Sequence, residues 1–258
     1  MRKLAFKLGI SLIVVVYILV FRIDFSSFLR TIKEVHLGWF FLALFLHTFG
    51  YLISGFRWKA ISEELNIDLP LLFFVKSYLV ATFFGFFLPS RFGGDIIRIG
   101  DMSTERELSS GISTVFYERV VGLFSLVILG ILALAVSPPE VKNLVLITFI
   151  ILFSVLFLTT LLLIKPEVLL WIPLKGKWRI KLKSIYNSIK KLQSRKLFLK
   201  TLLWSLLLQI NVIIHYWAIG KAVGIHTPFL AYFFLIPTML ILMAIPISFQ
   251  GIGVRDYF

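Results

Sequence analysis

An apolar run of membrane-spanning length ends in a polar segment, Leu88–Arg98, which reads Leu-Pro-Ser-Arg-Phe-Gly-Gly-Asp-Ile-Ile-Arg. Proline and paired glycines interrupt a helix and free backbone groups that lipid cannot solvate, so such a break survives only within protein or beside a water-filled cavity. Arg91 and Arg98 could bind a phosphate through their paired N–H groups, and the N–H groups that follow Gly93-Gly94 would add a positive helix end. Asp95 could meet a cationic group. The segment predicts a polar binding site inside a membrane protein.

Two adjacent charges, Glu118 and Arg119, lie about seven residues into the apolar stretch 111–136, on the order of 10 Å below its start at the rise of an α-helix. Insertion scales put each charge at about 3 kcal/mol at a helix centre, so we expect both to face the bundle interior, pair with other groups or line a wet cavity. In one interpretation Glu118 joins Asp95 in binding a cationic headgroup. In the other, these charges form a buried ion pair with Asp95 or Arg98.

A second interrupted segment closes the last apolar run and repeats the order of the first. It runs from proline through serine and phenylalanine to Gly251 and Gly253, and then to Arg255 and Asp256. Such a repeat is expected if corresponding elements of two halves build one site, although gaps are needed to align them and chance similarity is the alternative.

The elements that must position these residues are membrane helices. Hydrophobic residues make up 59% of the chain, and the mean hydropathy is +0.95, both far above ordinary soluble domains. Together they predict an all-α polytopic integral membrane bundle with re-entrant or broken helices, as a single domain over 1–258. The apolar stretches of near-spanning length are 8–21, 37–56, 70–88, 111–136, 143–164, 201–222 and 229–247.

Several chemistries are excluded by residue type or spacing. The chain has no cysteine, which rules out disulfides and thiolate chemistry. His36, His47 and His226 form no metal-ligand spacing, and we expect Asn211 and His215, four residues apart, to make interhelical hydrogen bonds. There is no phosphate-binding loop or nucleophile elbow. We therefore predict no metal, no cofactor and no catalytic residue.

A basic segment, 165–200, carries eleven lysines and arginines against the single acid Glu167, within a chain of formal charge +14. Positive charge beside spanning helices follows the positive-inside rule, so the prediction is a cytoplasmic loop and no nucleic-acid binding. Apolar residues recur there at spacings of three and four, which indicates an amphipathic helix that either lies on anionic headgroups or forms a solvated linker. These residues are Trp178, Leu182, Ile185, Ile189 and Leu192.

Charge counting also discriminates between two threadings of the chain. If the segment 70–98 dips into the membrane and returns to the same face, more lysines and arginines lie on one side than under simple alternation. The re-entrant threading places the N-terminus and the 165–200 loop together in the cytoplasm. The stretch 8–21 is then a retained signal anchor, since no small-residue cleavage site follows it.

Four patches occur together and in order: Arg57-Trp58, Leu88–Arg98, Val115–Gly122 and Pro246–Asp256. In these patches the chain resembles the UPF0104 family, the transmembrane flippase region of lysylphosphatidylglycerol synthases, over nearly all of its length. The resemblance implies an integral membrane protein that moves aminoacylated phosphatidylglycerol or another lipid between leaflets. Some relatives are associated with polyprenyl-linked sugar pathways.

The sequence departs from the family pattern in two ways. Aminoacyl-transferring relatives carry a large soluble catalytic domain, whereas the longest non-membrane stretch here is 165–200, so synthase activity is not expected. Relatives also continue through at least one more helix beyond the motif that ends at Asp256.

We therefore expect a multi-pass lipid flippase of the cell (plasma) membrane, with membrane lipids as partners: an anionic phospholipid or a lipid-linked headgroup. A homo-oligomer or a partner membrane enzyme stays open. The alternative is a membrane-embedded transferase or accessory protein acting on lipid-linked sugar, with Asp95 or Glu118 as general base. A scaffold for another membrane enzyme is a third possibility.

Overall fold

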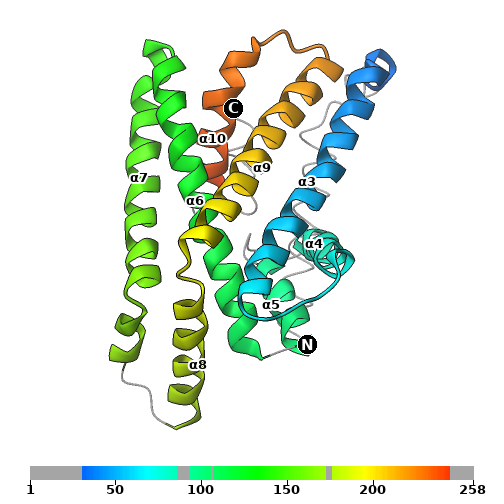
Figure 1. Ribbon diagram of the computed structural model, residues 1–258. Helices are drawn as coiled ribbons and strands as arrows, with labels where there is room; N and C mark the ends of the chain where they lie inside the picture. Colours follow the sequence, from blue (N-terminus) through cyan, green and yellow to red (C-terminus); the bar gives the residue numbers. More distant parts are fainter. Residues whose placement is uncertain (1–30, 86–92, 106, 173–175, 245–258) are drawn as a thin grey trace, which may run out of the picture.

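The computed structural model of the chain describes residues 31–85, 93–105, 107–172 and 176–244, and these residues are helical with no strand among them (Figure 1). The prediction of an all-α fold is confirmed. The elements are α3 (Leu37–Glu64), α4 (Leu71–Gly85), α5 (Gly93–Glu105), α6 (Leu108–Val136), α7 (Pro139–Ile164), the short 3-10 helix η1 (Pro166–Trp171), α8 (Lys177–Lys191), α9 (Arg195–Ala222) and α10 (Phe229–Ala244).

Four helices of the described chain are long and apolar enough to cross a membrane: α3, α6, Val145–Ile164 within α7, and α9. They correspond to four of the predicted stretches and confirm the membrane bundle. Local sequence sets some of their ends. Ser137, Pro138 and Pro139 separate α6 from α7, and the hydroxyl of Ser194 caps α9 by accepting from the N–H of Leu197 at 3.3 Å. The stretch 8–21 lies outside the described residues.

The central helix of the bundle is α6. It packs against α3, α5, α7, α8, α9 and α10. The most extensive contact between two helices is the antiparallel pairing of α3 with α9 (Figure 1). The buried apolar residues at the core of this arrangement come mainly from α6, α7, α8 and α9, with Val120, Val121 and Leu192 fully buried. Side chains on α6 are therefore held from several directions at once.

The segment between α3 and α6 leaves and returns at the same end of the bundle. Near that end the indole Nε1 of Trp58, close to the end of α3, donates to Thr114 Oγ1, close to the start of α6, at 3.1 Å. The helix α4 has 15 residues, about 22 Å of helix, which is too short for a hydrocarbon core of about 30 Å. The end of α3 and the start of α6 thus share one end of the bundle, as the re-entrant threading requires, whereas simple alternation requires positions 57–69 and 91–110 at opposite ends (Figure 1).

The basic segment forms η1 and α8 at this same end (Figure 1). The predicted amphipathic helix is present, but much of its apolar stripe covers protein, because Ile189 and Leu192 are buried in the core and Ile185 packs against it. Ser184 on α8 also hydrogen-bonds Ser109 Oγ at 2.9 Å. Only Trp178, at the far end of the stripe, is largely exposed. The interpretation in which the whole apolar stripe of this helix lies on headgroups is therefore wrong.

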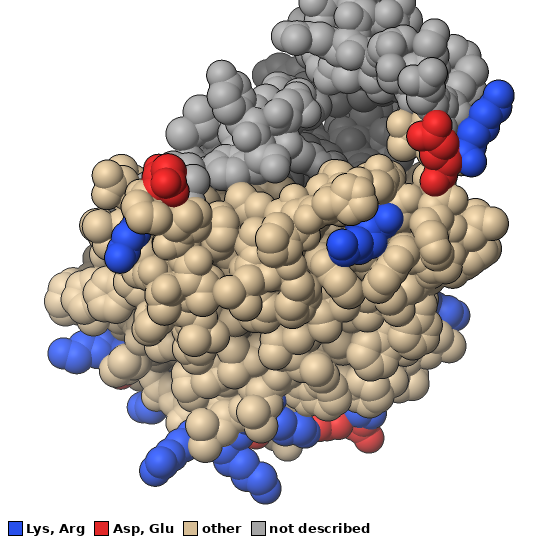
Figure 2. All heavy atoms as spheres, turned by 90° about the horizontal axis from the view of Figure 1, so that it is seen from above, with Lys and Arg blue, Asp and Glu red and all other residues tan. Residues whose placement is uncertain are grey.

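The opposite end of the bundle has a different surface. Viewed from that end, the described surface is mostly uncharged, with isolated lysines, arginines and acids near its rim (Figure 2). The excess positive charge of 165–200 thus lies at the end that also holds the 65–70 and 105–108 connections. This asymmetry is the one that the positive-inside rule predicts for a cytoplasmic face.

Candidate functional site

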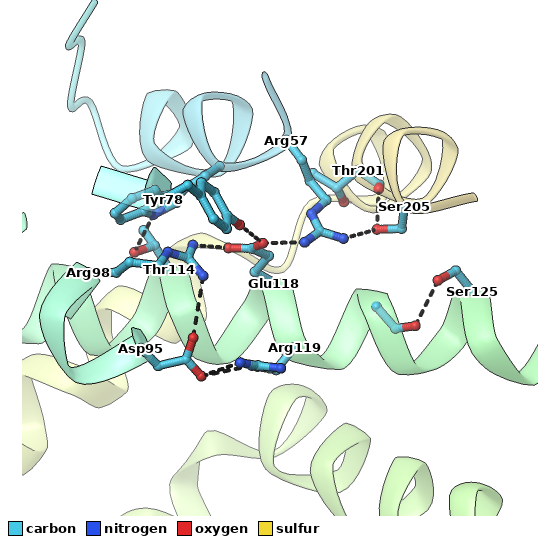
Figure 3. A network of polar contacts seen from close by, with 12 residues as sticks. Arg57, Tyr78, Asp95, Arg98, Thr114, Glu118, Arg119, Ser125, Thr201 and Ser205 are labelled. Carbon is cyan, nitrogen blue, oxygen red and sulfur yellow. Dashed lines mark hydrogen bonds and ion pairs between the residues drawn. The ribbon is translucent and has the colours of Figure 1, made fainter. Parts of the chain in front are cut away.

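Glu118 lies at the centre of a buried charge network between α3, α4, α5 and α6 (Figure 3). Its Oε1 accepts from the guanidinium of Arg57 and from the hydroxyl of Tyr78, and its Oε2 accepts from the guanidinium of Arg98. The Glu118 side chain is 4% exposed, and its two arginine partners are almost as buried. Three donors from three helices therefore hold one carboxylate inside an apolar bundle.

Arg98 is fixed by aromatic rings as well as by charge. Its guanidinium carbon lies 4.2 Å from the ring centroid of Trp58 and 4.0 Å from that of Tyr78. These two rings meet edge to face, with centroids 5.7 Å apart. A guanidinium stacks on aromatic faces in a way that an ammonium group cannot reproduce, so this position is specific for arginine.

Asp95 forms the second half of the network. Arg98 Nη1 lies 3.5 Å from Asp95 Oδ1, while Arg119 donates from Nε and Nη2 to Asp95 Oδ2 at 2.9 and 2.6 Å (Figure 3). Asp95 lies in the first turn of α5, where a negative charge is favourable. The Arg119 side chain is 50% exposed, so this pair connects the buried centre to the surface of α6.

Arg57 extends the network to α9. Its Nη1 donates to Ser205 Oγ at 3.1 Å, and that hydroxyl donates to the carbonyl oxygen of Thr201 at 2.8 Å. The Nε atoms of Arg57 and Arg98 are buried, and no hydrogen-bond acceptor for them occurs in the described part of the chain. Two N–H donors are therefore available inside the site, and buried donors of this kind are costly unless something binds them.

The charges of these residues do not cancel. The network contains three guanidinium groups, from Arg57, Arg98 and Arg119, and two carboxylates, from Asp95 and Glu118. When all five are ionised it carries one net positive charge. An apolar bundle with this composition is electrostatically suited to hold one additional anionic group.

Glycines permit the close packing that brings α5 into the network. A Cβ at Gly94 would lie 3.0 Å from the carbonyl oxygen of Ala81 on α4, and one at Gly111 would lie 2.8 Å from the carbonyl oxygen of Ile99. Any side chain at these positions would push α5 away from α4 or from α6. The predicted break at Gly93-Gly94 coincides with the first residues of α5. Gly94 lets α5 pack closely against α4.

The structure brings together Asp95, Arg98, Glu118 and Arg119, and it places Gly93 and Gly94 beside them at the start of α5. The interpretation of Glu118 as a member of a buried ion pair with Arg98 is confirmed, and Arg119 pairs with Asp95 although its own side chain is 50% exposed. The other predicted site residues lie outside the described part of the chain: Arg91, Gly251, Gly253, Arg255 and Asp256.

Sequence reasoning did not place Arg57, Tyr78 and Ser205 in the site. Arg57 carries a detectable signal, since it is a charge directly after the apolar stretch 37–56 and belongs to the Arg57-Trp58 patch. Tyr78 and Ser205 carry none, because a tyrosine or a serine in a membrane helix has many possible roles. No group of three or more potential metal ligands occurs in the described part of the chain.

The fold and the network define a class: a polytopic α-helical membrane protein with a buried arginine–carboxylate cluster between its helices. The chain belongs to the family described as the lysylphosphatidylglycerol synthase TM region, whose family model matches residues 4–258. No curated protein and no solved structure matches the chain significantly.

Proposed function

We propose that this protein moves lipid headgroups between the leaflets of a membrane, and that the network around Glu118 and Arg98 binds the headgroup phosphate. The observation that carries the proposal is the single net positive charge of a buried network that also offers two free arginine Nε–H donors. A phosphodiester carries one negative charge and several acceptor oxygens. It would therefore neutralise the network and accept from the free donors.

The depth of the network fits a headgroup path. Glu118 is ten residues beyond Leu108, the first of the 29 residues of α6, or about 15 Å along a helix of about 44 Å, which places it within the hydrocarbon core and not at its edge. Binding sites in transporters commonly lie near the midplane beside interrupted helices. The acyl chains would remain in lipid while the headgroup crosses beside α4 and α5.

A headgroup that also carries an amine would have a second contact. Asp95 pairs with Arg119, whose side chain is 50% exposed, whereas Glu118 pairs with Arg98, whose side chain is 5% exposed. Exchange of Arg119 for a substrate ammonium group is thus the less costly rearrangement of the two. The family description supports aminoacylated phosphatidylglycerol as a candidate substrate, with another anionic or lipid-linked headgroup as the alternative. We place the protein in the plasma membrane with its basic end in the cytoplasm.

The transferase interpretation has less support. A general base needs a carboxylate oxygen that can accept the substrate's proton. Both oxygens of Glu118 already accept from arginine or tyrosine donors, and Asp95 is held by two arginines. No contact in the described part of the chain favours proton abstraction over electrostatic binding.

The test uses purified protein in vesicles that contain a labelled anionic phospholipid, with leaflet exchange as the readout. We expect Arg98→Lys to retain part of the exchange, because it keeps the charge and loses the planar fork and the ring stacking. Arg98→Ala should abolish exchange. The matched control is Arg179→Ala, which removes an exposed arginine of α8 and should leave exchange unchanged.

Thermal unfolding of the same variants separates binding from folding. If Arg98 served only to neutralise Glu118, the double variant Arg98→Ala with Glu118→Gln would recover both stability and exchange. Recovery of stability without exchange supports headgroup binding. Normal exchange by a stable Arg98→Ala protein would overturn the proposed site.

A further inference from the structure

A second set of polar contacts joins α3 to α9, apart from the charge network. His215 Nδ1 lies 2.9 Å from the carbonyl oxygen of Ala43, and Asn211 Nδ2 donates to the carbonyl oxygen of Leu46 at 2.9 Å. The rings of His47 and His215 face each other with centroids 5.2 Å apart. The expected interhelical hydrogen bonds of Asn211 and His215 are therefore present, and a second histidine adjoins them.

These histidines lie within the membrane-spanning helices. His47 is ten residues from the start of α3 and ten residues before Arg57, about 15 Å along the helix from each. An ionisable side chain at that depth is costly to keep without a task. The two rings belong to different helices, so the distance between them depends on the separation of α3 and α9.

The hydrogen bond to Ala43 fixes the tautomer of His215. His215 Nδ1 faces a carbonyl oxygen, which only accepts, so this nitrogen carries the proton and Nε2 is the basic atom. His47 Nε2 pairs with the hydroxyl of Tyr51 at 3.2 Å, and Tyr51 can donate to it. When Tyr51 donates to His47 Nε2, His215 Nε2 is the basic nitrogen of the pair that is left for an added proton.

The groups around the pair do not include a compensating charge. The titratable neighbours are Tyr51 on α3 and Tyr216 on α9, whose ring lies 5.5 Å from that of His215. On α10 the nearest titratable group of the described chain is Tyr232, which faces Gly220 on α9. No lysine, arginine, aspartate or glutamate of the described chain forms a hydrogen bond or ion pair with either imidazole. Two protonated rings at 5.2 Å would therefore repel each other without screening.

We propose that His47 and His215 form a binding site for one proton, taken up at His215 Nε2, in the contact between α3 and α9. A second proton, on His47 Nε2, would reverse the hydrogen bond to Tyr51, whose hydroxyl would then accept, and would require the two helices to separate. This proton site lies apart from the charge network that contains Glu118.

The two sites share one pair of rigid elements. Arg57 and Ser205, which form the arm of the charge network, lie on the same α3 and α9 that carry the histidines. Between them the helices are in tight contact, since a Cβ at Gly50 would lie 3.2 Å from Asn211 Nδ2. A change in helix separation at the histidines is transmitted to the Arg57–Ser205 contact. Resting on the proposed function, this predicts that proton occupancy changes the rate of headgroup exchange.

The site itself is tested without any transport assay. The chain has four histidines, so imidazole nitrogens labelled with ¹⁵N can be resolved by NMR in detergent and titrated across the ordinary histidine range near pH 6.5. We expect the ¹⁵N signals of His47 to follow a different pH curve in His215→Gln than in the wild type, because interacting sites do not titrate independently. The matched control, His226→Gln in the α9–α10 connection, should change neither ring. Identical titration of His47 with and without His215 would overturn the proton site.

Coupling is tested by leaflet exchange between about pH 5.5 and pH 7.5, on either side of the histidine range. The wild-type rate should change several-fold, His215→Gln should be flat across this range, and His226→Gln should follow the wild type. The same pH profile in wild type and His215→Gln would overturn the coupling. If the NMR titrations show interacting rings but no variant exchanges lipid at any pH, the proposed lipid transport fails and the proton site stands.

Discussion

Arg57 and Glu118 are 61 residues apart in the chain and form a buried ion pair that joins α3 to α6. The two helices run antiparallel, and α4 and α5 follow between them in the chain, so this pair joins α3 directly to α6 beside the segment that sequence alone marks as a polar break (Figure 1). Arg98 reaches the same carboxylate from α5. Glu118 is thereby the point at which the spanning helices and the re-entrant segment meet.

Removal of Arg57 should destabilise the protein strongly. Arg57→Ala leaves Glu118 buried with one arginine fewer, and breaking a buried pair in this way costs about 3–5 kcal/mol in the free energy of unfolding. The measurement is thermal or denaturant unfolding in detergent. Arg179→Ala, at an exposed position of α8, should remain within about 0.5 kcal/mol of wild type. Equal stability of the two variants would show that the buried pair of Arg57 and Glu118 does not stabilise the fold.

Burial predicts a graded series among the arginines. The Arg119 side chain is 50% exposed and that of Arg98 is 5% exposed, although both pair with Asp95. Arg119→Ala should therefore destabilise by about 1 kcal/mol or less, and Arg98→Ala by several times as much. Both free energies come from the same unfolding experiment. An Arg119→Ala protein less stable than Arg98→Ala would contradict the arrangement of the network.

The parts of this site that sequence predicted are those where a single residue is costly in lipid. Glu118 and Arg119 are identifiable because a charge at membrane depth needs a partner, and Asp95 and Arg98 because they follow a proline and two glycines. Sequence could not choose between a ligand and an ion pair for Glu118, since both satisfy the same charge. That choice depends on which helices are neighbours.

Other features depend on tertiary contacts that no local pattern encodes. The apolar stripe of α8 has the same spacing whether it faces headgroups or protein, and only the packing of Ile189 and Leu192 into the core decides between them. Tyr78 joins the site because α4 is held close to α5, which in turn requires glycine at position 94. The shared end of α3 and α6 was predictable because charge on either side of a membrane follows a rule that does not depend on packing.

Topology is testable because the chain has no cysteine. Single cysteines at Asp68 and Glu105, near the two ends of the re-entrant segment, and at Asn187 on α8 are all exposed. All three should react with an impermeant maleimide from one side of the membrane, which we expect to be the cytoplasmic side. A cysteine at Glu140, exposed at the start of α7, should react only from the other side. Labelling of positions 68 and 105 from opposite sides would exclude the re-entrant course.

The contact between α8 and the bundle can be tested with two isoleucines of one helix. Ile189 is 3% exposed and packs into the core, whereas Ile180 is 73% exposed. Ile189→Ala should lower the free energy of unfolding by about 2–5 kcal/mol, because it removes buried methyl groups and leaves a cavity. The same change at Ile180 should have an effect within about 0.5 kcal/mol.

Limited proteolysis within α8 gives a second measurement for the same pair of variants. Because Ile189→Ala weakens docking of α8 onto α6, cleavage among the lysines of α8 should become faster under native conditions, and Ile180→Ala should be cleaved at the wild-type rate. If instead α8 were held by headgroups through its exposed residues, Ile180→Ala would release it in vesicles and Ile189→Ala would not. The outcome therefore decides whether this basic helix is part of the folded bundle or an attachment to the lipid surface.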